Sequence, residues 1–219
     1  VLGSIIFGAL VIGIFSYFAA GTLILITGQF QVFFSLLAGV VNGIGLIFSI
    51  SSFNQSGEIT RFLGGWGELG IGFTLNLPAI IFSILVIVLN LTIILYIRSR
   101  KDRIFFTLFN YFFAILISLS LTNDLFNLYV SLELLSLISI LLIGYQRKGY
   151  QIWAGIKYLS ISSIAMSMYL LGMMMIYRMG GSLNIDQLEV SLQGDPLTIK
   201  VAASLLLVGL ATKGGVFVF

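Results

Sequence analysis

The sequence predicts an all-α fold, a polytopic bundle of transmembrane helices. Its 219 residues are 59% hydrophobic and only 9% charged, with a mean hydropathy of +1.13, far outside the range of soluble domains. About seven apolar windows approach the ~20 residues that cross a bilayer. They predict a single transmembrane domain over residues 1–219. The windows lie at about 1–24, 30–51, 76–97, 104–121, 125–145, 152–177 and 198–219.

The composition excludes several kinds of site. The chain has no cysteine and no histidine. It therefore cannot supply a disulfide, a thiolate nucleophile, an iron–sulfur cluster, or a haem or copper site with those ligands. Its net charge of +3 is too small and too scattered for nucleic-acid binding. We expect no cofactor, no metal and no redox chemistry in this chain.

The first three windows are joined by polar segments. A short polar turn at 28–31 separates the first two. Residues 52–75 mix glycine, serine and charged side chains, which favours an extramembrane loop that contains a hairpin. Pro78 then falls in the first turn of the third helix, where a missing N–H costs little. Because the chain begins at Val1 and stops at Phe219 inside an apolar run, we expect part of a longer subunit.

The loops differ in charge, and the difference predicts an orientation. Two short loops, after the third and fifth windows, carry most of the basic side chains and fall on one side of the membrane. Most acidic side chains lie on the other side. The positive-inside rule then places the basic loops in the cytoplasm and the N-terminus outside. The basic residues are Arg98, Arg100, Lys101, Arg103, Arg147 and Lys148, and the acidic ones are Glu58, Glu68, Asp124, Asp186, Glu189 and Asp195.

The fifth window carries an acid about midway, Glu133. A carboxylate there costs roughly 2.5 kcal/mol or more by insertion scales, so it should face protein or water. Two bases also lie inside apolar windows, Lys157 and Lys213. We interpret these three ionisable side chains as an ion path in which Glu133 pairs with Lys157 or Lys213. The alternative is a static ion pair that holds the helices together.

In the sixth window Lys157, Ser160, Ser163 and Ser167 are spaced for one face of a helix. This face is either a hydrated stripe beside an ionisable lysine or a surface where small hydroxyl residues let helices pack closely.

The seventh window places Lys213 directly before Gly214 and Gly215. Adjacent glycines weaken a helix and expose backbone groups, which membranes tolerate inside protein or next to water. Interrupted helices of this kind are typical of ion sites in transporters. The alternative is that Lys213 lies near the cytoplasmic end and extends its ammonium to the membrane surface.

Several motifs resemble a known family. TNDLFNLYVSLELL (122–135) is similar to the fifth-helix motif of the antiporter-like membrane subunits, which are shared by Mrp-type cation/proton antiporters, energy-converting membrane-bound hydrogenases and respiratory complex I. Residues 155–177, with the GGSLNIDQL that follows, resemble the Mrp antiporter D subunit. ATKGGVF resembles the lysine motif of the seventh helix, and GGWGELGI the loop before the third. The matches run in order from Gly64 to Phe219.

The resemblance implies a fold of about fourteen helices with inverted repeats and broken helices, of which this chain is the first half. It also implies that Glu133 and Lys213 form the core of a proton half-channel, with Lys157 as the helix-six lysine. Asp124 matches an acidic position nearer the outer surface. This chain departs from the family at Asn76, where an acid is usual, at Val218, where a proline is usual, and in lacking the second repeat.

The function expected is translocation of H⁺, or exchange of Na⁺ for H⁺, by a subunit of a multi-subunit complex in the plasma membrane of a prokaryote. Its partners would be other membrane subunits of that complex, the bilayer and the transported ions. One alternative is the pumping module of a redox-driven complex, such as a membrane-bound hydrogenase or an NADH:quinone oxidoreductase. Another is a membrane scaffold without transport, although a scaffold needs no ionisable core.

Overall fold

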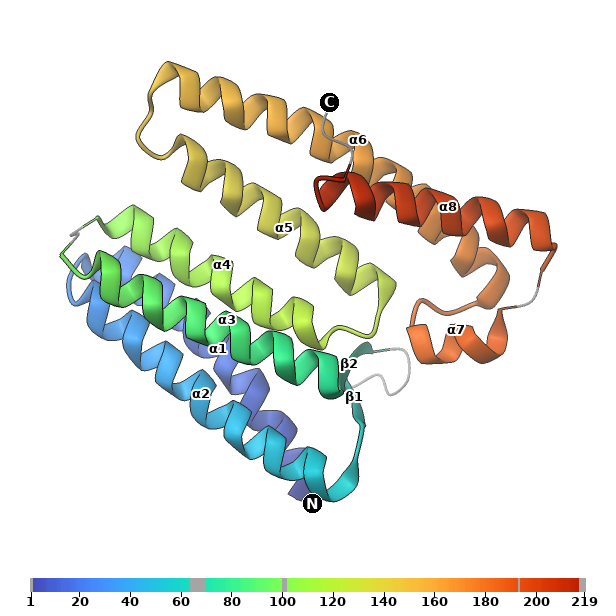
Figure 1. Ribbon diagram of the computed structural model, residues 1–219, viewed down its shortest axis with the longest axis horizontal. Helices are drawn as coiled ribbons and strands as arrows, with labels where there is room; N and C mark the ends of the chain where they lie inside the picture. The colour runs from blue at the N-terminus through green and yellow to red at the C-terminus, as the bar shows by residue number, and fades with distance from the viewer. Residues whose placement is uncertain (1, 64–69, 100–101, 193, 217–219) are drawn as a thin grey trace. The chain divides into compact units, whose positions relative to one another are not determined.

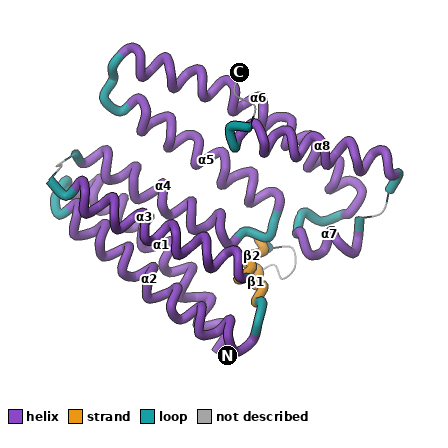
Figure 2. Tube along the Cα trace, viewed as in Figure 1, coloured by secondary structure: helices purple, strands orange, loops and turns teal. Residues whose placement is uncertain are grey.

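The prediction of an all-α fold is confirmed. The computed structural model describes residues 2–63, 70–99, 102–192 and 194–216, and nearly all of them are helical (Figure 1). Figure 2 shows one small sheet and the short loops that connect the helices. In chain order the described elements are α1 (Leu2–Thr27), α2 (Gln31–Ser56), β1 (Ile59–Leu63), β2 (Ile71–Leu75), α3 (Leu77–Ile97), α4 (Arg103–Leu121), α5 (Leu125–Gly144), α6 (Gly149–Gly180), α7 (Ile185–Ser191) and α8 (Pro196–Lys213).

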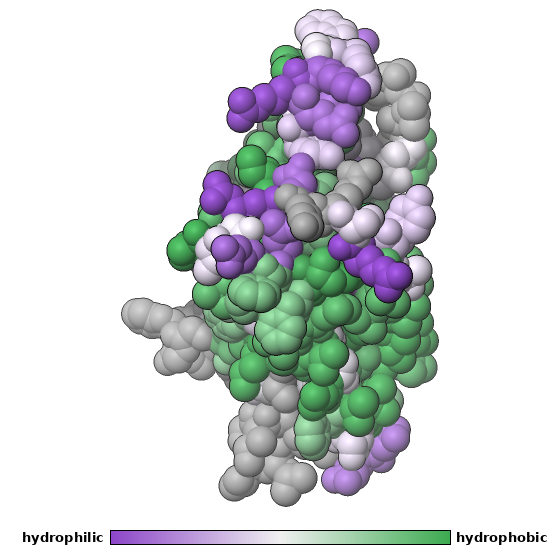
Figure 3. Space-filling view, turned by 90° about the vertical axis from the view of Figure 1, so that its left-hand side faces the viewer, coloured by the Kyte–Doolittle hydropathy of each residue, from purple (hydrophilic) through white to green (hydrophobic). Residues whose placement is uncertain are grey.

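The long helices correspond to the seven apolar windows. Six of them are long and apolar enough to cross a membrane, and the assessed part of α1, Val11–Thr27, is a shorter apolar helix. Figure 3 shows hydrophobic side chains in broad continuous areas of one face, as expected for a surface in contact with lipid or other helices. The chain is therefore built as a multi-pass membrane protein. Several residues used above lie outside the described part, namely Val1, Gly64, Glu68, Arg100, Lys101, Val218 and Phe219, as does most of the GGWGELGI motif.

Contacts divide the chain into two compact units. The first holds α1 to α4, and aromatic side chains of α4 fill much of its interior. Phe106 is fully buried in a cluster with Ile24 of α1 and Ile97 of α3. The turn between α1 and α2 passes through Gly28, whose φ of 66° suits glycine.

Buried amides cross-link the first unit. Asn42 of α2 donates to the Gly13 carbonyl of α1 at 2.6 Å, and Asn110 of α4 donates to Ser35 Oγ of α2 at 2.7 Å. Hydrogen bonds between helices stabilise membrane bundles, in which apolar burial alone gives little drive for association.

The segment between α2 and α3 contains the two-stranded sheet, in agreement with the predicted hairpin. Thr60 and Thr74 share a side-chain hydrogen bond of 2.8 Å across it. The start of the segment differs from expectation, because α2 continues to Ser56, inside the range predicted as loop.

The second unit holds α5 to α8 with segment 62–72. Its core is a cluster around Met166, Tyr169 and Met173 of α6. The Tyr169 hydroxyl donates to the Leu125 carbonyl at 3.0 Å, which ties α6 to the start of α5. The short helix α7 was not predicted, and α8 ends at Lys213 instead of continuing through its apolar window.

Two glycines let α6 and α8 pack backbone to backbone. A Cβ atom on Gly172 of α6 would lie 2.7 Å from the Ala202 carbonyl oxygen of α8. A Cβ atom on Gly209 of α8 would lie 2.8 Å from the Ala165 carbonyl oxygen of α6. Both distances are shorter than ordinary contact, so small residues are required at this interface, as at many membrane helix pairs.

We expect Gly172→Ala to lower the free energy of unfolding by about 1–3 kcal/mol, because the new methyl group forces α8 away from α6. Thermal unfolding of the detergent-solubilised protein measures this change. Gly43→Ala is the control, since nothing lies within 4 Å of a Cβ there. Equal effects in the two variants would contradict the close packing.

Candidate functional site

Asp124 caps the N-terminus of α5. Its Oδ1 atom accepts from the backbone N–H groups of Phe126 at 2.9 Å and Asn127 at 2.8 Å. Free N–H groups and the helix dipole make this position favourable for a carboxylate. A neighbouring bond, from Asn127 Nδ2 to Thr122 Oγ1 at 2.7 Å, closes the same turn. A structural role for Asp124 is thus visible, whatever its part in ion movement.

Glu133 lies nine residues further along α5, about 14 Å from Asp124 at 1.5 Å per residue. The rest of the chain covers it partly. Its charge is within electrostatic range of the Lys213 ammonium of α8, but the direct hydrogen-bond partner of that ammonium is Ser162. Of the predicted pairings of Glu133, the described residues therefore show a long-range interaction with Lys213 and no hydrogen bond to it.

Lys213 is the last residue of α8, and its Nζ atom donates to Ser162 Oγ of α6 at 2.5 Å. Ser162 is only 5% exposed. It lies in the interior of α6, roughly 20 Å from one end of that helix and 27 Å from the other at 1.5 Å per residue. Lys213 itself is partly covered by the described chain, and its ammonium bonds to the middle part of α6 and not to a loop at a helix end.

The glycines after Lys213 end the helix in a Schellman motif. The Val216 N–H donates to the Ala211 carbonyl at 2.9 Å, and the Gly215 N–H donates to the Thr212 carbonyl at 3.1 Å. Gly215 has φ of 79°, the left-handed conformation that this motif requires. The predicted interruption is therefore an ordered helix end, and the negative end of the helix dipole favours the ammonium there.

The contact between Ser162 and Lys213 follows from the packing of α6 on α8. Gly209 lies against the backbone at Ala165, and Lys213 comes one turn after Gly209. Ser162 comes about one turn before Ala165, so the two side chains meet. Sequence reasoning missed Ser162. The available signal was the small-residue face of α6 formed by Ser162, Ala165 and Gly172.

Lys157 lies on another face of α6, which the described chain leaves exposed. Its Nζ atom is 5.5 Å from the centre of the Trp153 ring. On the same exposed face, Ser160 donates to the Ile156 carbonyl at 3.0 Å, and Ser167 donates to that of Ser163 at 2.8 Å. These bonds return to the backbone of α6 itself, as expected of small polar residues in membrane helices.

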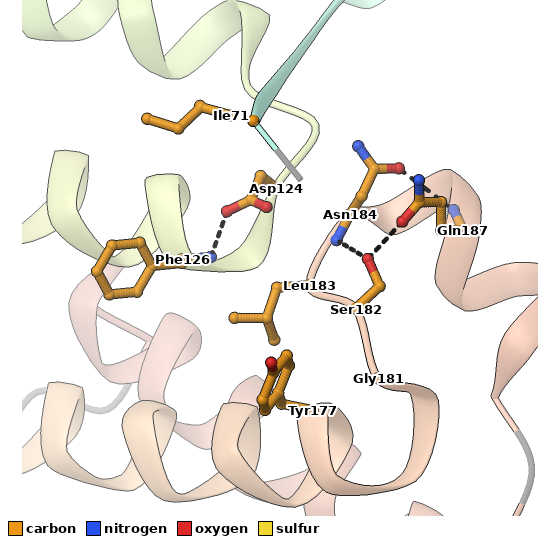
Figure 4. A pocket seen from close by; sticks show the side chains of 10 residues that line it. Ile71, Asp124, Phe126, Tyr177, Gly181, Ser182, Leu183, Asn184 and Gln187 are labelled. Carbon is orange, nitrogen blue, oxygen red and sulfur yellow. Dashed lines mark hydrogen bonds between the residues drawn. The ribbon is translucent and has the colours of Figure 1, made fainter. Parts of the chain in front are cut away.

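A pocket of about 410 Å³ lies beside the start of α5 (Figure 4). Two backbone hydrogen bonds join the start of α5 to the segment before α7, both of which line the pocket. The Leu125 N–H donates to the Leu183 carbonyl at 2.9 Å, and the Ile185 N–H donates to the Asn123 carbonyl at 3.0 Å. Polar side chains line it, and Figure 4 shows the Ser182 hydroxyl donating to Gln187 Oε1 at 2.6 Å. Within the described residues, no group of three or more acidic side chains could hold a metal ion.

Comparison with known proteins gives consistent matches. Residues 122–219 match the family model described as NADH:quinone oxidoreductase/Mrp antiporter, transmembrane. The chain is 30% identical over 173 residues to the D subunit of the Na(+)/H(+) antiporter of Alkalihalophilus pseudofirmus, a match that covers 74% of this chain and 35% of the relative. It is 38% identical over 121 residues to the N subunit of the NADH-quinone oxidoreductase of Desulforudis audaxviator, covering 54% of this chain and 24% of the relative.

The fold also matches a solved structure. A chain of the archaeal membrane-bound sulfane sulfur reductase, a respiratory membrane complex, superposes with a TM-score of 0.79 at 23% identity. The match covers 94% of this chain and 44% of that one. This chain thus spans less than half the length of these related proteins.

We expect Asp124→Ala to destabilise the protein by about 1 kcal/mol through loss of the cap, and Asp124→Asn to be close to wild type because asparagine also caps. Thermal unfolding compares the two. Ion transport by the Asn variant then reports on the charge alone. If the Asn variant is as unstable as the Ala variant, the carboxylate acts by something other than capping.

Proposed function

Since this chain belongs to the family of antiporter-like membrane subunits, we propose that it translocates H⁺, or exchanges Na⁺ for H⁺, within a multi-subunit membrane complex. One observation carries the proposal. Lys213 lies at an ordered helix end, where its ammonium donates to the buried Ser162 of α6 and is within electrostatic range of Glu133 of α5. An ionisable pair in that position is costly and is typical of ion paths.

The chemistry follows from the coupling between the two charges. An ammonium and a carboxylate in low dielectric each stabilise the charged form of the other, while desolvation favours both neutral forms. When Glu133 takes up a proton, Lys213 loses that stabilisation and releases a proton from Nζ more readily. The released proton passes to a water molecule or the next ionisable group. Return of the carboxylate charge reverses the step.

Further side chains are assigned supporting roles. Lys157 is proposed as the next base along the path, and its exposed face would require a further helix to enclose it. Ser160, Ser163 and Ser167 lie on that same face and would help to hydrate it. Asp124 is proposed as an acidic group at the mouth, beside the polar pocket.

The setting proposed is the plasma membrane of a prokaryote, with other membrane subunits of the same complex as partners. The excess of basic residues in the loops after α3 and α5 supports an N-terminus on the outside. Broad exposed apolar faces on the helices support lateral contacts with such partners.

A second candidate is the pumping module of a redox-driven complex. The resemblance to the N subunit of an NADH-quinone oxidoreductase favours it. The same Glu/Lys chemistry would serve, with the driving reaction in other subunits. A scaffold without transport has less support, because the contact of Lys213 with Ser162 and the charge of Glu133 have no purpose in a simple anchor.

We expect Glu133→Gln and Lys213→Ala each to reduce ion transport by ~100-fold or more, the contribution typical of an essential proton-transfer group. The measurement is gradient formation in vesicles that carry the complete complex, with a native gel to show assembly. Glu189→Gln and Lys200→Ala are matched controls, since both side chains are exposed on α7 and α8. Full transport in an assembled Lys213→Ala complex would contradict the proposal.

Co-purification separates the two candidates. Tagging the full-length subunit and identifying its stable partners should yield membrane subunits without redox centres if the complex is an independent antiporter. Iron–sulfur or nickel–iron proteins in stoichiometric amounts would instead support the redox-driven complex.

A further inference from the structure

We propose that Ser162 is a positioning residue for Lys213, a hydroxyl group that holds the lysine in place both with and without its proton. The inference rests on the proposed function, since it assigns a role at the same site. It concerns a residue that the charge pattern of the sequence does not indicate.

The position of Ser162 supports this role. Its side chain is 95% removed from solvent by α6 and its neighbours, and its Oγ atom accepts from Lys213 Nζ at 2.5 Å. Gly209 holds the two helices in close contact one turn away, so the distance between Oγ and Nζ is set by backbone packing. Ser162 therefore meets Lys213 at a fixed point of the interface.

Ser162 also differs from most other serines of the unit. Those serines donate their hydroxyl hydrogen to the carbonyl four residues earlier in the same helix, which occupies the donor. Among the described residues, the contact of Ser162 Oγ is the Lys213 ammonium instead. The serines that bond to their own helix are Ser136, Ser139, Ser160, Ser167 and Ser204.

A hydroxyl that is not committed as a donor can serve both forms of a lysine. Serine offers one O–H donor and two acceptor lone pairs. When Nζ is an ammonium, it donates to Oγ. When Nζ has passed its proton to water or to the next group of the path, it carries a lone pair, and the Ser162 O–H rotates to donate to it. The same two atoms stay bonded while the charge changes.

A carboxylate partner would behave differently. It would stabilise the ammonium and favour retention of the proton, because its attraction depends on the charge of the lysine. Here the charged neighbour, Glu133 of α5, acts through electrostatics, and the direct hydrogen-bond partner is neutral. Ser162 thereby positions the lysine, and Glu133 controls its charge.

The test compares variants of the full-length subunit in its assembled complex, in vesicles. Ser162→Ala removes the hydroxyl, and Ser162→Cys replaces it with a weakly bonding thiol of similar size. Ser162→Thr keeps the hydroxyl. Ser49→Ala is the matched control, a fully buried serine of α2 whose hydroxyl bonds to its own helix. The readouts are the transport rate, its pH profile and assembly on a native gel.

We expect the Ala and Cys variants to transport about tenfold more slowly, as for loss of a hydrogen bond to a charged group. The alkaline side of their pH profile should move to lower pH, because the hydrogen bond to the charged ammonium is stronger than the one to the neutral amine, and its loss therefore costs the protonated form more. The Thr variant should restore rate and profile, and the Ser49 control should match wild type. If the Ala variant does not assemble, the Cys variant carries the test.

The proposal is overturned if an assembled Ser162→Ala or Ser162→Cys complex keeps the wild-type rate and pH profile. It is also overturned if Ser162→Thr assembles and loses as much transport as they do. In either case inactivity of Lys213→Ala leaves the proposed function standing. Wild-type transport by Lys213→Ala would instead remove the proposed function itself.

Discussion

The cost of an ionisable side chain in hydrocarbon is the constraint on which this structure depends. Each such group needs a partner or water, since its transfer to the bilayer centre costs several kcal/mol. In the second unit the constraint is met for Lys213 by Ser162 and by the charge of Glu133. The close packing of α6 on α8 makes this contact possible, because the glycines at the interface let the two helices approach closely near Ser162 and Lys213.

Neutral polar groups inside the bundle also need hydrogen-bond partners. Buried amides of the first unit bond across helices, as Asn42 does to Gly13 and Asn110 to Ser35. The free N–H and carbonyl groups at helix ends have the same need. Asp124 satisfies the N–H groups that begin α5, and the Schellman motif after Lys213 satisfies the carbonyls that end α8. The Asp124 carboxylate thus satisfies the backbone of α5, whereas the Lys213 side chain leaves the backbone of α8 to the glycines and bonds to Ser162.

Hydropathy predicts this fold well and the candidate site in part. Long apolar windows located every spanning helix, because length and composition alone decide which segments can cross a bilayer. Glu133 and Lys213 stood out for their cost in such windows. Ser162 did not, since a neutral serine is inexpensive anywhere and its importance depends on which face of α6 meets α8. The seven residues of α7 were missed because a helix so short has no clear apolar period.

The left-handed backbone at Gly215 has a consequence for mutational tolerance. A side chain at φ of 79° meets the following carbonyl, and the strain amounts to roughly 1–2 kcal/mol for most residues. Most single-nucleotide changes of a glycine codon introduce such a side chain. They would loosen the end of α8 and displace the ammonium without altering the lysine. The codon two places after Lys213 is thus a second position at which a mutation can disturb the ammonium.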